Sequence, residues 1–240
     1  MKQIFVVLLV VCGANVQAQD EEVKTSTHTY NHAVKLYATG RFNPYSDVHI
    51  KHRENYAIQT SVSDYIQPSL AVSFRNKRHN YHELELSRVS VRSTSVNPVI
   101  QTSQGSFPLG YRLNTTHIAM RYEFIFPFIK KKQALFVPAV GAAVMPYYSR
   151  YSLKPYSPAD VPVTSSTLGA QTFIIPRLQV NISKRVFIDA NVPVCITDFG
   201  AKRNHIQDPT LPVNAQQYTI ADVQILPGVY TARLGLGIKI

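Results

Sequence analysis

The sequence reaches its C-terminus with VYTARLGLGIKI, residues Val229 to Ile240. Apolar residues alternate here with polar or small ones, and Leu234, Leu236 and Ile238 share one side of the alternation. A period of two residues is typical of a β-strand with one apolar and one polar face. The stretch therefore predicts a strand that separates an apolar medium from a polar space.

The N-terminus indicates export. Lys2 precedes a short apolar run, Ile4 to Val11, and VQA at residues 16–18 has the small residues of a signal-peptidase site. The run is too short to cross a bilayer as a helix. We therefore expect residues 1–18 to be a cleaved signal peptide and residues 19–32 to be a flexible periplasmic lead-in.

Composition and charge narrow the class of protein. Charged residues make up 16% of the chain, against about 25% in a typical soluble domain. Only Cys195 lies beyond the predicted signal peptide, which excludes an intramolecular disulfide. The formal net charge is +11. For an exported chain, anionic headgroups or lipopolysaccharide are more plausible counter-charges than nucleic acid.

Seven further segments have the pattern or the apolar length of strands. The clearest is His117 to Phe126, in which Ile118, Met120 and Tyr122 alternate with polar or small residues. In another segment the alternation changes phase between Leu86 and Val89, which predicts a β-bulge. The eight predicted strands cover residues 33–42, 65–75, 82–92, 117–126, 134–148, 169–182, 186–196 and 229–240.

The connections between these segments alternate strictly in length. Short connections cover residues 76–81, 127–133 and 183–185, and long ones cover 43–64, 93–112, 149–168 and 197–228. Outer-membrane barrels have short periplasmic turns and long extracellular loops. The pattern predicts an all-β fold, a closed antiparallel transmembrane β-barrel over residues 33–240 with eight strands. Residues 217–226 are either a strand pair above the membrane or evidence for ten strands.

Prolines inside the predicted strands set a condition on this fold. Proline cannot donate to a strand ladder, and a closed barrel has no free edge on which to place it. We therefore expect these prolines at bulges or at strand ends. They are Pro68, Pro138, Pro146, Pro176 and Pro193.

Two segments carry a family resemblance, SKRVFIDANVP at residues 183–193 and LGLGIKI at residues 234–240. With them, the chain resembles small eight-stranded outer-membrane β-barrel proteins of the Bacteroidetes type over residues 33–240. The resemblance implies an outer-membrane location and insertion by the barrel-assembly machinery, and it specifies no activity. Such barrels usually end in an aromatic residue, whereas this chain ends in Ile240.

Ionisable residues on the polar faces of the predicted strands form a candidate lumen network. An eight-stranded barrel is just wide enough for side chains to fill it, and acids and arginines inside it should pair through charge-assisted hydrogen bonds. The network therefore predicts a plugged lumen, with a narrow small-solute channel as the alternative. Its members are Glu83, Glu85, Arg88, Arg121, Glu123, Arg177, Asp189 and Arg233.

All three short turns carry basic residues. In a barrel these residues ring the periplasmic rim, where they are candidate contacts for anionic lipid headgroups; ordinary solvated turn charge is the alternative. They are Arg75, Lys77, Arg78, Lys130, Lys131, Lys132, Lys184 and Arg185. The long segment 197–228 exceeds a plain connector and is the candidate site for an extracellular partner.

The sequence contains no recognisable catalytic or metal-binding motif. His49 and His52 form only a loose pair, no Gly-x-Ser-x-Gly elbow is present, and His117 has no evident serine partner. We therefore expect no enzyme and no cofactor, but a structural or interaction role through the extracellular loops. The rival readings are an outer-membrane lipid-modifying enzyme and a periplasmic lipocalin-like carrier with its apolar face inside.

Overall fold

The structure is a computed structural model of the chain. It describes residues 31–41, 45–53, 56–63, 66–96, 99–102, 105–108, 110–129, 134–156, 161–226 and 231–240. For the strands within residues 45–63 and 99–108 it describes the backbone alone. The predicted signal peptide and nearly all of the predicted lead-in therefore lie outside the described residues.

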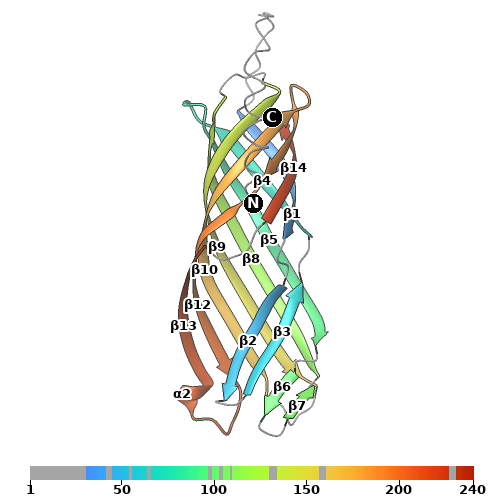
Figure 1. Cartoon of the computed structure of the whole chain (residues 1–240), viewed down its shortest axis with the longest axis vertical. Helices are drawn as coiled ribbons and strands as arrows, with labels where there is room; N and C mark the ends of the chain where they lie inside the picture. Colours follow the sequence, from blue (N-terminus) through green and yellow to red (C-terminus); the bar gives the residue numbers. More distant parts are fainter. Residues whose placement is uncertain are drawn as a thin grey trace, which may run out of the picture.

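Eight antiparallel strands form a closed ring (Figure 1). β1 pairs with both β4 and β14, and β11 pairs with both β10 and β14, so the ring has no open edge at this level. The predicted closed eight-stranded antiparallel barrel is confirmed. Its strands are β1 (His32–Arg41), β4 (Ile66–Arg75), β5 (Tyr81–Val96), β8 (Tyr111–Pro127), β9 (Phe136–Pro155), β10 (Val163–Asn181), β11 (Val186–Asn191) and β14 (Thr231–Lys239).

Further strands extend the barrel at the end away from the C-terminus (Figure 1). β12 (Val194–Ile206) continues β11 beyond Pro193 and pairs with β10 and with β13 (Gln217–Ile225), which follows the short helix α2 (Val213–Gln216). Residues 217–225 are thus part of a strand pair that extends beyond the ring, on the side away from the C-terminus. A separate antiparallel sheet contains β2 (Tyr45–Arg53), β3 (Tyr56–Ser63), β6 (Val99–Thr102) and β7 (Gly105–Pro108).

The predicted long loops are largely strand, which corrects the sequence-based boundaries. β8, β9 and β10 contain 17, 20 and 19 residues, whereas about 9–11 residues cross a bilayer. Segment 149–168 supplies residues to β9 and β10, segment 93–112 to β5 and β8, and segment 197–228 to β12 and β13. The predicted boundaries were wrong because the alternation continues beyond them with apolar residues facing inward and polar residues facing outward. The apolar residues therefore no longer mark the outer face of the barrel.

Local irregularities lie where the sequence predicted them. The pairing of β5 with β8 shifts register between Leu86 and Arg88, which confirms the bulge. Pro193 separates β11 from β12, and Pro146 borders an interruption in the pairing of β8 with β9. Pro68 lies beyond the last residue of β4 that pairs with β5. The ladder therefore accommodates these prolines without losing closure.

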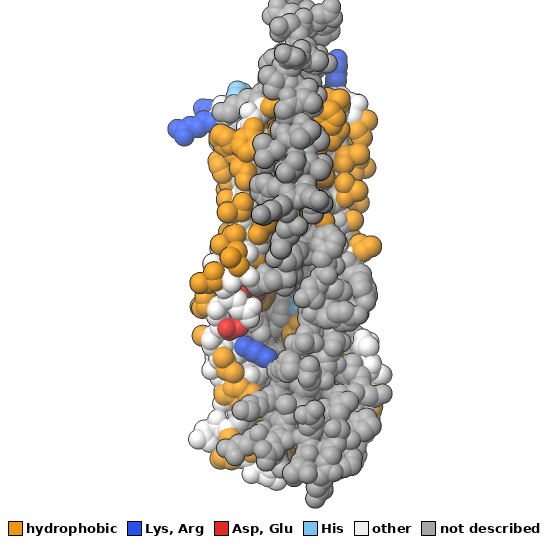
Figure 2. All heavy atoms as spheres, viewed as in Figure 1, with side chains coloured by type: hydrophobic (Ala, Val, Ile, Leu, Met, Phe, Trp, Pro, Cys, Tyr) orange, Lys and Arg blue, Asp and Glu red, His pale blue; other side chains and the backbone are white. Residues whose placement is uncertain are grey.

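The outer face of the ring is apolar. Leu36, Leu84, Ile118 and Leu236 are about half exposed on four different strands, at 59, 47, 46 and 53%. Figure 2 shows hydrophobic side chains over the half of the barrel nearer the C-terminus. We call this part the inner half. The outer half comprises residues 111–116 of β8, 149–155 of β9, 163–167 of β10 and 200–206 of β12.

No helix in the described part of the chain has the length and hydropathy needed to cross a membrane.

Candidate functional site

The inner half of the lumen contains a buried network of charged side chains. Strand alternation directs every second residue inward, so that Glu83 and Glu85 on β5 face Arg121 and Glu123 on β8. Each charged member is at most 4% exposed. The members are four cations, Lys35, Arg121, Arg177 and Arg233, and four carboxylates, Glu83, Glu85, Glu123 and Asp189, so their formal charges sum to zero.

The first cluster centres on Arg177. Its guanidinium lies 3.2 Å from Glu83, 2.9 Å from Glu123 and 3.1 Å from Asp189. Lys35 lies 2.6 Å from Glu83 and 2.9 Å from Asp189. Glu83 and Glu123 are direct cross-strand neighbours, a like-charge pair that would be destabilising alone. Arg177, from the opposite wall, bridges the two carboxylates and offsets their repulsion.

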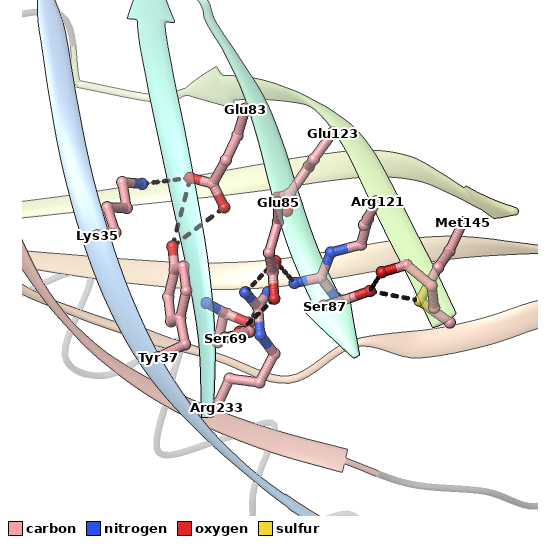
Figure 3. Close-up of polar contacts among 12 residues, drawn as sticks. Lys35, Tyr37, Ser69, Glu83, Glu85, Ser87, Arg121, Glu123, Met145 and Arg233 are labelled. Carbon is pink, nitrogen blue, oxygen red and sulfur yellow. Dashed lines mark hydrogen bonds and ion pairs between the residues drawn. The ribbon is translucent and has the colours of Figure 1, made fainter. Parts of the chain in front are cut away.

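The second cluster centres on Glu85 (Figure 3). Its carboxylate pairs with Arg121 and, at 2.5 Å, with Arg233, and it accepts a 2.5 Å hydrogen bond from the hydroxyl of Ser69. The Arg233 guanidinium carbon lies 3.9 Å from the centre of the Tyr37 ring. The Tyr37 hydroxyl lies 3.1 Å from Glu83 and 2.9 Å from Asp189. Tyr37 therefore joins the two clusters across the lumen.

Glycines on the lumen wall make room for this network. A Cβ on Gly235 would overlap the Tyr37 ring, one on Gly237 would overlap the Phe187 ring, and one on Gly141 would overlap Glu123. The alternating glycines of the C-terminal strand thus provide the space in which large side chains cross a narrow lumen.

Arg88 occupies a different place from the other predicted network residues. It faces Ala119 across the ladder, just beyond the bulge, and is half-buried. The close ion pairs described above join the other seven predicted residues. Arg88 lines a lateral recess of about 260 Å³ formed by residues 66–68 and 88–92. The recess lies where β4 and β5 cease to pair, beyond Leu70 and Leu86.

Lys35 and Tyr37 are network residues that the prediction omitted. Both stand on the polar side of the alternation in β1, opposite Val34 and Leu36, and this was the signal that could have identified them. The predicted network considered acids and arginines on later strands. Because β1 closes the ring against β14, its polar face also points into the lumen.

A hydrogen-bonded polar layer follows toward the outer half. Ser149 Oγ lies 2.6 Å from His117 Nδ1, and the Tyr151 hydroxyl lies 2.9 Å from His117 Nε2. His117 therefore has a serine partner, which corrects the sequence interpretation; β8 and β9 place the two residues directly opposite each other. Asp198 accepts hydrogen bonds from Tyr147 at 2.9 Å and Gln171 at 2.6 Å.

The interior of the outer half is an apolar core. Its fully buried members are at most 1% exposed, and Tyr151, Val161, Leu211 and Tyr218 pack against them. These members are Tyr111, Leu113, Leu153, Val163 and Ile206. From the inner end outward, the lumen thus contains paired charges, then hydrogen-bonded polar groups, then an apolar core.

The described members of the predicted rim lie at the end of the barrel that carries the C-terminus, where Figure 2 shows basic side chains projecting. Lys77, Arg78, Lys184 and Arg185 are exposed, and Arg75 is half-buried with its guanidinium 5.6 Å from the Tyr81 ring centre. The β4–β5 turn is held by Asn76, whose side-chain oxygen accepts from the backbone nitrogens of residues 78 and 80 at 2.9 and 3.1 Å. Residues 130–132 lie outside the described residues.

The remaining candidate sites are a metal pair and a partner-binding segment. The side chains of His49 and His52 are not among those described, and the described residues contain no cluster of three or more potential metal ligands. Segment 197–228 is folded over most of its length as the β12–β13 pair rather than as a loop. Ile220, Val223 and Ile225 on β13 are 49–76% exposed.

Neither a protein-family model nor a curated protein sequence matches this chain. Solved structures similar to it include the crystal structure of the outer membrane protein OprG from Pseudomonas aeruginosa, at 11% identity and a TM-score of 0.48, covering 89% of this chain and 97% of that one. Another is the solid-state NMR structure of the outer membrane protein AlkL in DMPC bilayers, at 10% identity and a TM-score of 0.32, covering 93% and 98%. The fold described above rests on the strand pairing of this chain itself.

Proposed function

We propose that this protein is an integral outer-membrane β-barrel with a sealed lumen, and that its folded outer half contacts partners or ligands outside the cell. The observation that carries the proposal is the neutral network of eight buried charges across the inner lumen. The protein has a structural and interaction role rather than an enzymatic one.

The distribution of apolar surface supports membrane insertion. In the inner half, the outward side chains are apolar while the inward ones are charged, as in outer-membrane barrels. A lipocalin-like carrier would have the opposite arrangement at this level. A closed ring also pairs its strands all the way round, so that backbone groups bond between strands, which a chain needs inside hydrocarbon.

The lumen network supports a seal rather than a conduit. Arg177 alone contacts three carboxylates, and Glu85 holds two guanidiniums. Moving one of these side chains aside would leave its partners charged and unpaired at a site with almost no solvent, which is costly. The apolar core of the outer half adds a second closure above it.

The outer half supports the interaction role. A rigid barrel that raises folded strands well beyond the bilayer provides a stable platform for recognition. Segment 197–228 contributes the exposed β12–β13 pair to this platform. We propose it as the extracellular partner site, and the basic rim at the opposite end as a contact for anionic phospholipids.

Two measurements test the proposal. The full-length protein should fractionate with outer membranes and migrate differently on gels before and after boiling. Reconstituted into planar bilayers, it should show negligible conductance where a porin in the same lipid conducts. Steady, reproducible single-channel openings would indicate a narrow channel instead of a sealed lumen. A protein in the soluble fraction whose gel migration is the same before and after boiling would refute the membrane barrel.

The lipid role of the rim has its own test. The variant K77E/R78E/K184E/R185E should retain fewer phosphatidylglycerol molecules in native mass spectrometry, because its rim repels anionic headgroups. Heat-modifiable migration should remain, since these side chains are exposed. Equal retention by the variant and the parent protein would indicate ordinary solvated turn charge.

A further inference from the structure

The outer wall carries a group of basic residues just beyond the apolar band. Arg112 on β8, Arg150 and Lys154 on β9 and Arg203 on β12 are all exposed and occupy outward positions of the outer half. We call these four residues the outer basic strip. They differ from both groups of basic residues considered above, the lumen network and the periplasmic rim.

Strand register aligns part of the strip along one row. Thr116, Arg150, Ser166, Arg203 and Thr219 are successive cross-strand partners on β8, β9, β10, β12 and β13. Arg150 and Arg203 are separated by one strand, so their backbones lie roughly 10 Å apart. Hydroxyl groups of the row stand beside and between the two guanidiniums. This row can donate to two anionic groups at once.

The next row toward the inner half is apolar. Ile118, Tyr148, Leu168 and Ala201 are again successive cross-strand partners. Ile118, Tyr148 and Leu168 are 46, 36 and 66% exposed. The two adjacent rows on the outer face therefore differ in chemistry. One presents hydroxyl and guanidinium groups, and the next presents apolar side chains that can contact acyl chains. Such a boundary is expected where the hydrocarbon of a bilayer meets its headgroups.

The strip concentrates positive charge. Arg112 and Lys154 are direct cross-strand neighbours, an arrangement of like charges that is destabilising by itself. Over the outward positions of the outer half that the structure describes, no Asp or Glu occurs. Arg203 donates a 2.9 Å hydrogen bond to the side-chain oxygen of Gln217, which carries no charge.

We propose that the outer basic strip binds the phosphate groups of a phosphorylated glycolipid of the outer leaflet, lipopolysaccharide. Guanidinium groups bind phosphate through paired, charge-assisted hydrogen bonds, and the apolar row below contacts the acyl chains of the same molecule. A soluble polyanion would match the strip but not the adjoining apolar row. The inference rests on the proposed outer-membrane location and names one ligand for the outer half.

The test uses the full-length protein in lipid nanodiscs, titrated with purified bisphosphorylated lipid A. The variant R150Q/R203Q should bind about tenfold more weakly, because it loses two charge-assisted contacts. The matched control S152Q/T164Q places the same two glutamines on outward positions of β9 and β10 without removing a cation, and it should bind as the parent protein does. The parent protein should bind lipid A that lacks both phosphates about as weakly as R150Q/R203Q binds intact lipid A.

Each alternative outcome is decisive. Unchanged binding by R150Q/R203Q, an equal loss in S152Q/T164Q, or full binding of dephosphorylated lipid A would each overturn the glycolipid site. Heparin binding as tightly as lipid A would make the strip a general polyanion site instead. The gel migration of every variant is compared before and after boiling, before any lipid is added. A variant whose migration does not change has failed to form the barrel, and this outcome is distinct from a loss of lipid A binding.

Discussion

The inner and outer halves of the barrel use the same strands with opposite polarity. In the inner half of β8, Arg121 and Glu123 point inward while Met120 points outward. In the outer half of the same strand, Leu113 points inward and Arg112 points outward. The register of β8 with β9 is the same on both sides of the interruption at Pro146. Which face of the strand is apolar therefore depends on what surrounds the barrel at that level and not on the strand itself.

The two halves are consequently stabilised by different forces. The outer half excludes water from an apolar core, as a soluble protein does. In the proposed membrane location, the apolar face of the inner half contacts lipid and gains less from folding, whereas its interior carries specific ion pairs. Substitutions that are harmless in one half should therefore be harmful in the other.

The largest effect is expected for Glu85→Leu. This change leaves Arg121 and Arg233 without the carboxylate that pairs with both, and loss of one partner of a buried ion pair costs about 3–5 kcal/mol. Urea unfolding in micelles, followed by far-UV circular dichroism because the chain contains no Trp, measures the loss. Asp222→Leu removes an exposed carboxylate of the β12–β13 pair and should be near neutral. Equal effects would contradict the buried network.

Leu153→Ala tests the core of the outer half. Leu153 is fully buried in the apolar cluster, and such truncations cost about 2–5 kcal/mol. Leu168→Ala, at an outward position that is 66% exposed, should cost far less. The comparison requires thermal unfolding of both variants in the same detergent. A small effect at Leu153 would mean that the outer half lacks a packed core.

An arginine placed on each outer face distinguishes the two media. Leu236→Arg puts a charge on the lipid-facing side of β14, where it should cost about 2–4 kcal/mol near the bilayer midplane. Ser152→Arg puts the same side chain on the outward face of β9 in the outer half, where water can solvate it. Unfolding free energies in bilayer vesicles should differ accordingly. Equal costs would refute the placement of the bilayer around the inner half.

The smallest effect is expected for a single methyl group on the closing strand. Gly237→Ala introduces a Cβ that overlaps the Phe187 ring, and such overpacking costs about 1–3 kcal/mol. Gly40→Ala is the control, because its Cβ would meet only Ala232 O, at 3.9 Å. The shift in the temperature at which the heat-modifiable band disappears compares the two. Indifference to Gly237→Ala would show that the lumen wall has spare room there.

The sequence predicted the closed barrel and the bulge near Leu86 because alternation and loop length are local signals. It did not predict the partner of His117, since Ser149 is 32 residues away and meets it only through the register of β8 with β9. It also ended several strands too early. A prediction that follows outward apolar residues stops where the medium outside changes from lipid to water.

The C-terminal strand separates what the sequence determines from what the tertiary structure determines. The alternation of Leu234, Leu236 and Ile238 with small or polar residues determined by itself that a two-faced strand exists, because side-chain direction along a strand repeats every two residues. Only the tertiary structure decided what each face meets. Ring closure brings Arg233 to Glu85 and seats Tyr37 and Phe187 beside Gly235 and Gly237, contacts that depend on strands far apart in the chain.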